Sequence, residues 1–316
     1  MSNTLIFILA IVLTMLATAA LIPFLKKKKY GQPIREEGNK EHYKKSGTPT
    51  MGGVAFTLVF ILSCILFIRF NVHVLFIVLY TLAYGLIGFI DDYAKIAKGN
   101  NLGLTEKQKL ILQFGVAFVL LILQYFLLDI DISKVNIPLF NVDINVSIFI
   151  IPILMFIVVG TTNATNLTDG LDGLLSSVSI PVFLGIAYLA KDTKVEVATS
   201  AIIFAGALIG FLVFNSNPAS IFMGDTGSMA IGGAIVSMLI SINKPIYLIF
   251  IGGIYFLEAV SVLVQTIYYK KYKKRVFLMA PIHHHFELKG YKETKIVAAF
   301  TTASVILTLF TILIIR

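Results

Sequence analysis

The sequence has little charge, a single cysteine and no tryptophan. Only 14% of its 316 residues are Asp, Glu, Lys or Arg, whereas a soluble globular protein has about a quarter. Cys64 alone cannot form an internal disulfide, and any aromatic belt at a membrane surface must consist of tyrosine and phenylalanine. Hydrophobic residues make up 57% of the chain. This composition excludes an ordinary soluble protein and indicates a polytopic membrane protein.

Ten apolar runs have the roughly 17–25 residues that a helix needs to cross a bilayer. They predict an all-α polytopic membrane protein of about ten transmembrane helices, forming one integral membrane domain over residues 1–316. The runs cover residues 3–25, 52–70, 73–90, 109–128, 147–165, 171–190, 196–214, 225–242, 245–268 and 295–315. Residues 129–147 alternate apolar and polar side chains around Pro138, which predicts a small β-hairpin on the outer surface.

The basic residues are distributed unevenly along the chain. Loops 26–51, 91–109 and 269–295 hold 20 of the 26 lysines and arginines. Positive charge is retained on the cytoplasmic side of membrane proteins, so these loops are predicted in the cytoplasm and both chain termini outside. The clusters need be nothing more than topology signals, although they could also attract an anionic lipid head group or a phosphorylated substrate.

Two adjacent carboxylates, Asp91 and Asp92, end the apolar run before the second basic loop, and Lys95 follows one helical turn later. Charge at the end of a membrane segment is costly unless it is hydrated, paired or bound to a cation. Adjacent helix positions point about 100° apart, so the two acids are expected to have different partners, whereas Lys95 can share the face of Asp91. An ion pair at a hydrated helix end would explain this stretch equally well.

Two further polar stretches precede or interrupt apolar runs on the same predicted side. The glycines and hydroxyls of Lys44–Gly53 suit an anion-binding loop, or an ordinary turn with Thr50 as the helix cap. Within Asn163–Gly173, Asp169 and Asp172 are three residues apart and can share one helix face. The asparagines of this stretch both donate and accept hydrogen bonds, as recognition of a nucleotide base requires.

The last two polar stretches contain an isolated acid and a run of histidines. Asp225 lies just before a glycine-rich apolar run, where it is either a helix cap or a ligand for a hard cation. His283, His284 and His285 would spread around a helix, which is poor geometry for one zinc ion. They are better suited to phosphate contacts and proton handling near neutral pH, with a hydrated run of no function as the alternative.

These acids lie on different segment ends that face one compartment. A few carboxylate oxygens, with phosphate completing the shell, suit Mg²⁺. Phosphoryl transfer needs a metal and basic groups to neutralise charge, and the lysines and histidines can contribute to that. An amide-rich site could hold a nucleotide base, and a membrane-embedded frame suggests that one substrate is a lipid.

Five stretches together resemble the bacterial phospho-N-acetylmuramoyl-pentapeptide-transferases, a family of the polyprenyl-phosphate N-acetylhexosamine-1-phosphate transferase superfamily. The matching stretches, in family order, are GTPTMGG (47–53), FIDDYAK (89–95), NATNLTDGLDGL (163–174), FMGDTGS (222–228) and PIHHHFE (281–287). The resemblance implies transfer of phospho-N-acetylmuramoyl-pentapeptide from its UDP carrier to undecaprenyl phosphate, releasing UMP. It also implies Mg²⁺, a homodimer in the bacterial plasma membrane, and a cytoplasmic active site with a groove for the lipid.

The resemblance also implies roles for individual residues. Asp225 is expected to bind Mg²⁺, and Asp91 and Asp92 form the catalytic pair, either handling the lipid phosphate or attacking the donor directly. The histidines 283–285 are expected to act on the substrate phosphate or sugar. The expected substrate-binding residues are Lys45, Thr50, Lys95, Lys107, Asn163, Asn166, Asp169, Gly170, Asp172, Asn215 and Phe222.

Two alternatives remain at this point. A related enzyme could transfer N-acetylglucosamine-1-phosphate from its UDP carrier with the same acids and metal, although GTPTMGG and PIHHHFE favour the muramoyl donor. A lipid or nucleotide-sugar transporter is also compatible with many membrane helices. Its polar groups would be expected near the membrane midplane rather than at one face. Neither the charge pattern nor the motifs suggest a nucleic-acid partner.

Overall fold

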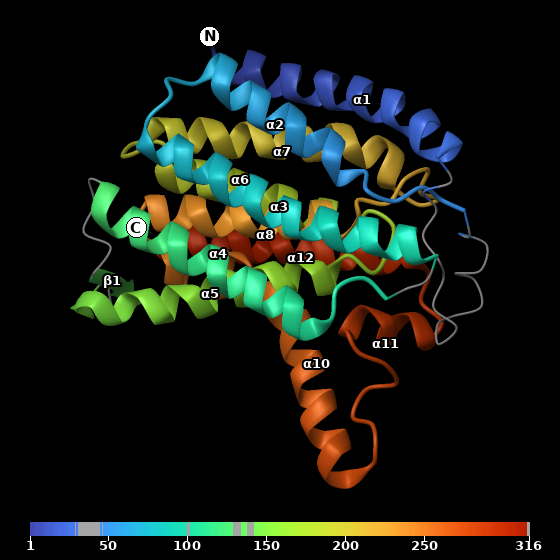
Figure 1. The fold of residues 1–316 in the computed structure, drawn as a ribbon. Helices are drawn as coiled ribbons and strands as arrows, with labels where there is room; N and C mark the ends of the chain where they lie inside the picture. Colours follow the sequence, from blue (N-terminus) through green and yellow to red (C-terminus); the bar gives the residue numbers. More distant parts are fainter. Residues whose placement is uncertain are drawn as a thin grey trace.

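The computed structural model describes residues 1–28, 30, 45, 47–99, 102–128, 134–137 and 142–314. These residues are mostly helical (Figure 1), which confirms the predicted all-α class. The helices are α1 (Asn3–Lys27), α2 (Gly53–Phe67), α3 (Val72–Lys98), α4 (Glu106–Leu127), α5 (Ile150–Thr168), α6 (Leu174–Ala190), α7 (Val195–Asn215), α8 (Gly224–Ser241), α9 (Leu248–Ile251), α10 (Gly253–Tyr272), α11 (Ile282–Leu288) and α12 (Glu293–Ile314). Two 3₁₀ turns, η2 (Ser147–Phe149) and η3 (Pro245–Tyr247), precede α5 and α9.

Every predicted apolar run contains a helix in the structure. Among the described residues, six helices are long and apolar enough to cross a membrane, and a bent pair brings the number to seven. Helices α2 and α6 are apolar but shorter. The chain is therefore a multi-pass membrane protein, while the number of ten crossings stays a prediction.

The expectation of one continuous helix over 245–268 is wrong. Pro245–Ile251 and Gly253–Tyr272 meet at an angle of 83°, and α10 leaves the bundle steeply (Figure 1). The break falls at the adjacent glycines Gly252 and Gly253. Glycine is a poor helix former, and glycine pairs are common sites of sharp helix bends.

The predicted loop from residue 91 also begins later than expected. Helix α3 continues to Lys98 and ends on Gly99, whose φ of 63° is left-handed. A left-handed glycine is a common helix end because it has no Cβ to clash. Asp91 and Asp92 therefore lie on a rigid helix rather than in a loop.

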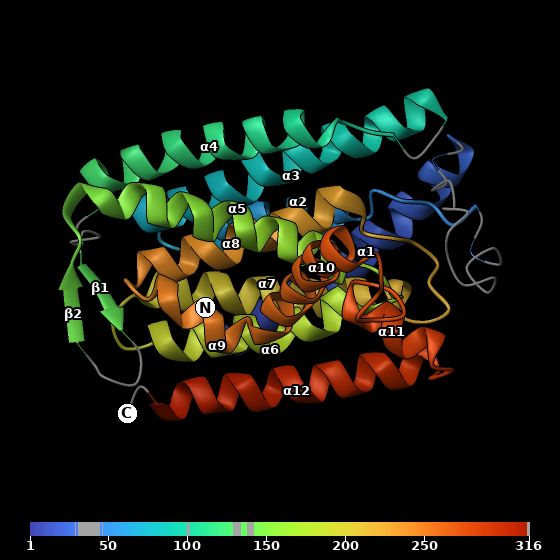
Figure 2. The same cartoon turned by 90° about the horizontal axis from the view of Figure 1, so that it is seen from below.

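Two short strands form an antiparallel ladder beyond α4. Strand β1 (Lys134–Ile137) pairs with β2 (Val142–Asn145), with Lys134 opposite Asn145 and Ile137 opposite Val142. Residues 129–133 and 138–141 of the predicted hairpin lie outside the described residues. Both marked chain ends lie at the end of the bundle that carries the strands, and α11 lies at the opposite end (Figures 1 and 2). The position of the strands outside the cell stays a prediction.

Helix α8 is the centre of the bundle. All of its residues from Thr226 to Ser241 are buried, and it packs against α3, α5 and α2. Helices α3 and α8 approach so closely at Gly88 that a Cβ there would collide with the backbone of Asp225. This contact brings the last turns of α3 beside the first turn of α8.

Candidate active site

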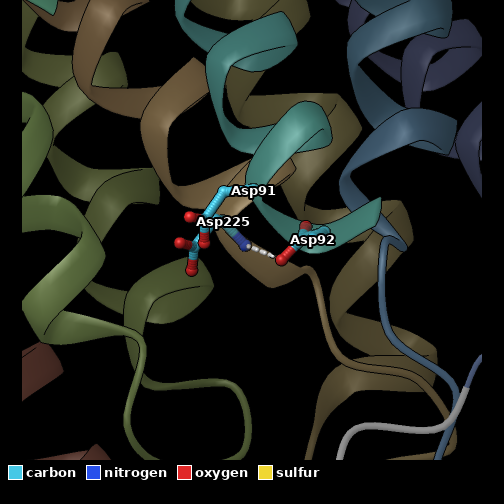
Figure 3. A group of neighbouring side chains, drawn as sticks. All are labelled: Asp91, Asp92 and Asp225. Carbon is cyan, nitrogen blue, oxygen red and sulfur yellow. Dashed lines mark hydrogen bonds between the residues drawn. The ribbon is translucent and has the colours of Figure 1, made fainter. Parts of the chain in front are cut away.

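Three carboxylates from two helices meet at the contact between α3 and α8. Asp91, Asp92 and Asp225 each offer an oxygen, and these oxygens lie within 4.8 Å of one another (Figure 3). Asp91 and Asp92 are buried, and Asp225 is half-buried. The structure thus brings together three acids that are up to 134 residues apart in the sequence.

Asp92 is engaged by the start of α8. One carboxylate oxygen accepts the Asp225 N–H at 3.1 Å, which is the bond drawn in Figure 3. The other accepts the Thr226 N–H at 2.9 Å and its hydroxyl at 2.7 Å. The first N–H groups of a helix have no partner within the helix, so Asp92 caps α8 from a neighbouring helix.

Asp91 has different partners from Asp92. One of its oxygens accepts the Leu104 N–H at 2.8 Å, and the other lies 2.6 Å from the Lys95 ammonium. Lys95 and Asp91 are four residues apart on α3 and share a face, as the sequence predicted. The expectation that the two adjacent acids have different partners is confirmed for their backbone partners, whereas the Lys95 ammonium is shared, lying 3.8 Å from Asp92 as well.

Asp225 is held from three sides. Its Oδ2 lies 2.6 Å from Nζ of Lys109 and 3.1 Å from Nζ of Lys95. Its Oδ1 accepts a hydrogen bond of 2.8 Å from the side chain of Asn166, which also donates to Ser228 at 2.9 Å. Asn166 thus contacts the acidic cluster, and its role in binding the nucleotide stays a prediction.

The donor set suits a hard divalent cation. Three carboxylates supply only oxygen ligands, which Mg²⁺ prefers over nitrogen and sulfur. In the structure the ammonium groups of Lys95 and Lys109 neutralise two of the three negative charges. A site with this excess of negative charge can accept a cation, and its lysines can turn to an anionic ligand.

Lys109 was not expected from the sequence, which favoured Lys107. Lys107 is exposed, whereas Lys109 reaches Asp225. Both residues lie in the first turn of α4 and point to different sides. Which of them faces the cluster depends on how α4 is rotated against α3 and α5, and the sequence carries no signal for that. The phosphate contact of Lys107 stays a prediction.

Asp169 follows α5 and lies among other acids. Partial burial raises the pKa of its carboxyl well above the usual range, and the negative charges of Asp225, Asp92 and Asp172 raise the pKa further. Burial disfavours the charged form of an acid, and so do neighbouring anions.

A second polar cluster surrounds Lys45. Its ammonium lies 2.7 Å from Asp172 and 2.8 Å from Glu293. The Asn217 side chain donates to both carboxylates, at 3.1 Å and 2.9 Å respectively. Sequence reasoning identified Lys45 and Asp172 but missed Asn217 and Glu293. Asn217 stands in a polar stretch between two apolar runs, which is a usable signal, while Glu293 had no local signal.

The three histidines lie on α11 and point to different partners, as expected for consecutive helical residues. His283 is fully buried, with Nδ1 3.1 Å from the Glu258 carboxylate. His284 lies 2.9 Å from Glu287. Nδ1 of His285 accepts the Leu278 N–H at 3.1 Å, and partial burial together with Lys289 lowers the pKa of this imidazole.

Several of the expected substrate-binding residues have structural partners. Asn163 donates to Gln113 of α4 at 2.7 Å. Asn215 accepts from Ser176 and donates to the Ile221 carbonyl, and it is buried. A Cβ on Gly170 would collide with the His283 ring, so this glycine lets α11 approach the end of α5.

The loops that precede α2 and α8 are joined by hydrogen bonds between their backbones. Phe222 donates its N–H to the Pro49 carbonyl at 2.8 Å, and its own carbonyl accepts the Gly52 N–H at 2.8 Å. Thr50 is buried between them, while Phe222 is half-buried. Roles for Thr50 and Phe222 in binding substrate stay predictions.

An apolar groove runs between α5 and the α9–α10 break. It is lined by aliphatic and aromatic side chains and small residues, among them Phe156, Gly160, Ala164, Tyr255, Phe256 and Leu263. Ala164 is two residues before Asn166, which binds Asp225. Residues two apart on a helix point about 200° apart, so the groove and the acidic cluster lie on different faces of the last turns of α5.

Comparison with known proteins gives matches over nearly the whole chain. Residues 74–243 match the model of glycosyl transferase family 4, and residues 45–56 match signature 1 of phospho-N-acetylmuramoyl-pentapeptide-transferase. A protein of that name from Halalkalibacterium halodurans is 44% identical over 313 residues, covering 96% of this chain and 95% of the relative. Namesakes from Staphylococcus saprophyticus and Bacillus subtilis are 45% and 44% identical, covering 96% and 95% of this chain and 96% and 94% of their own.

Proposed function

The chain belongs to the phospho-N-acetylmuramoyl-pentapeptide-transferase family, and on that premise we propose that Asp91, Asp92 and Asp225 form its catalytic centre. The chain transfers the phospho-N-acetylmuramoyl-pentapeptide group from a nucleotide-linked donor to a lipid carrier in a membrane. The proposed donor is the UDP-linked sugar peptide and the proposed acceptor is undecaprenyl phosphate. The carboxylate cluster with its two lysines is the observation that carries the assignment of the centre.

In the proposed reaction, an oxygen of the lipid phosphate attacks the sugar-linked phosphorus of the donor. A P–O bond forms at that phosphorus, the P–O bond to UMP breaks, and UMP leaves with its electron pair. Mg²⁺ held by Asp225 would neutralise the charge of the donor diphosphate. Lys95 and Lys109 contact Asp225 in the structure and can turn to the phosphates, since phosphoryl transfer depends on such neutralisation.

We assign the handling of the acceptor phosphate to Asp91 rather than Asp92. Both oxygens of Asp92 are engaged by the first residues of α8. Asp91 has one oxygen bonded to the Leu104 N–H, and its other oxygen faces the ammonium groups of Lys95 and Lys109, which end long side chains. A group that orients or deprotonates a phosphate must be able to exchange its partner, and Asp91 meets that condition. Asp92 then holds Asp225 in place.

The remaining polar residues divide between the two ends of the donor. Lys45 and Asp172, with Thr50, Phe222 and the 163–170 segment, would bind the uridine end. His283–His285 would position the sugar or its phosphate. The network around Lys45 supports the first assignment, because it offers donors and acceptors at one point.

The apolar groove between α5 and α10 would take the lipid chain of the acceptor. Its lining is almost wholly apolar, and α5, which lines the groove, also carries Asn166, a partner of Asp225. We further propose that residues 1–316 act as one domain in the plasma membrane, with the centre facing the cytoplasm and the chain forming a homodimer. The concentration of lysine and arginine in three loops supports the orientation.

Release of UMP by the purified protein in detergent tests the function. The acceptor is undecaprenyl phosphate, and UDP-N-acetylmuramoyl-pentapeptide and UDP-N-acetylglucosamine are offered in separate reactions, each with Mg²⁺ or with EDTA. We expect release with the muramoyl donor in Mg²⁺ only, and none from Asp225→Asn. Release with the N-acetylglucosamine donor alone would move the substrate to the neighbouring enzyme class. Uptake into vesicles without UMP release would indicate a transporter.

A further inference from the structure

Glu293, the first residue of α12, lies at the centre of the network around Lys45. Its carboxylate lies 2.8 Å and 2.9 Å from the Lys45 ammonium. It also accepts the backbone N–H of Asp172 at 2.5 Å and the Asn217 side chain at 2.9 Å. One carboxylate thus joins three segments that are 76 to 248 residues from it in the sequence.

Asp172 and Glu293 share the same two donors. The Asp172 carboxylate also accepts from Lys45 and from Asn217, and in addition from the Ala219 N–H at 3.0 Å. Two carboxylates that share the same donors would repel each other if no cation lay between them. Lys45 supplies that charge. Burial opposes the charged form of Lys45, but hydrogen bonds to Asp172 and Glu293 outweigh it and raise the lysine pKa.

The network is closed on one side and open on the other. The Asp172 side chain is 2% exposed, whereas the side chains of Glu293 and Lys45 are 15% and 21% exposed. A ligand that arrives from solution therefore meets Lys45 and Glu293 first. A buried network whose members are all paired holds its open end rigidly, which is what a binding site for a flat polar ring requires.

We propose that Glu293 is a positioning residue of the donor-nucleotide pocket, holding Lys45 and the Asp172 backbone in the arrangement that receives the uridine end of the donor. This inference rests on the proposed function, which assigns Lys45 and Asp172 to that pocket. Glu293 is not part of the acidic cluster. Its removal is expected to weaken donor binding and to leave the chemical step nearly intact.

If Glu293 acted only as an acid at the start of a helix, its substitution would have a different effect. An acid in the first turn of a helix interacts favourably with the helix dipole wherever the helix lies. Glu106 holds the same position in the first turn of α4 and is exposed. Glu106 variants are therefore matched controls for Glu293 variants, because both lose the dipole interaction and only the latter lose the contacts to Lys45, Asp172 and Asn217.

The experiment compares Glu293→Ala and Glu293→Gln with Glu106→Ala and Glu106→Gln. For each protein, steady-state rates give kcat and the KM of each substrate, and titration calorimetry gives the Kd of UMP. We expect Glu293→Ala to raise the donor KM and the UMP Kd by about tenfold or more, because the variant loses a charged group that is hydrogen-bonded to Lys45 and Asp172. The lipid KM and kcat should stay within about threefold, and the Glu106 variants should match the wild type.

Glu293→Gln separates the two contributions of the carboxylate. Its amide oxygen can still accept from the Asp172 N–H, but it brings no charge to Lys45. An intermediate rise in the UMP Kd is therefore expected, and this variant also covers the case in which the alanine variant does not fold. An unchanged UMP Kd in both Glu293 variants would overturn the inference, as would equal losses in the Glu106 controls. A wild type that binds UMP but releases none from the donor would contradict the proposed function alone.

Discussion

Asp91 and Asp92 are neighbours in the sequence, yet their side chains have unlike surroundings. Asp92 accepts three hydrogen bonds from the first residues of α8, and Asp91 is paired with Lys95. The first arrangement stabilises the fold and the second leaves a carboxylate next to an exchangeable cation. Substitution of the two residues should therefore have separable effects.

We expect Asp92→Asn to lower the free energy of unfolding by about 1–2 kcal/mol, because an amide has one acceptor oxygen where the carboxylate has two, and an N–H of Asp225 or Thr226 loses its partner. Asp91→Asn should lower turnover steeply with a smaller change in thermal stability. Melting temperatures in detergent and EDTA, together with kcat for both variants, measure the difference. A melting temperature for Asp92→Asn equal to that of the wild type would show that the cap does not hold the start of α8.

For single residues, the sequence predicted which side chains belong to the site better than it predicted which residues they contact. The three acids, Lys95 and Asp172 were identified because charged residues beside apolar runs stand out. Lys109 was missed, because the rotation of α4 about its axis is set by packing. Glu293 was missed because its partners lie in other segments, and no local pattern connects them.

Among the elements, the break between α9 and α10 has the largest effect on shape. The apolar run alone indicated one membrane helix, since length and hydropathy cannot report a bend. Both halves keep apolar faces, and the groove lies in the angle between α10 and α5. Two glycines in mid-run were a signal that could have been read as a hinge.

Filling this groove should impair use of the lipid. Gly160 lines the groove, and a Cβ added there would meet no atom within 4 Å. We expect Gly160→Leu to raise the KM of undecaprenyl phosphate by about tenfold or more, because its side chain occupies the space of the lipid chain, and to leave the donor KM unchanged. Steady-state kinetics with each substrate varied in turn provides the measurement.

Gly115 of α4 offers a matched control for Gly160. It is also a helical glycine with open space at its Cβ, and it does not line the groove. Gly115→Leu gains the same helix propensity of about 1 kcal/mol and should leave both KM values unchanged. If the two variants had equal lipid KM values, the groove would not be the lipid site.

The whole molecule has two unlike ends. The strands and both marked chain ends lie at one end, and α11 lies at the other (Figure 1). The charge count alone predicted that the termini share one side and the polar motifs the other. What it could not predict was that α3 and α8 meet in one acidic cluster while the start of α12 joins a second one around Lys45, because helix order in a bundle is not encoded in hydropathy.

Cysteine labelling can test the orientation in the membrane, since Cys64 is fully buried and should give no background. Lys191 and Lys289 are exposed near opposite ends of the bundle. In intact cells, a membrane-impermeant maleimide should label Lys191→Cys and not Lys289→Cys. Permeabilised cells should allow both to react, which controls for reactivity. The reverse pattern in intact cells would invert the predicted topology.

Helix α8 is buried inside the protein from Thr226 to Ser241, and this bears on how the protein is made. It is not among the described helices that are apolar enough to cross a membrane by themselves, and its buried surface includes closely packed glycines such as Gly227 and Gly232. During synthesis, whether the translocation machinery releases a segment into lipid depends on the hydrophobicity of that segment. We expect that α8 does not insert by itself and enters the membrane only by packing against helices that are already inserted. The carboxylate cluster would then form late, when Asp225 of α8 comes to lie beside the earlier helix α3.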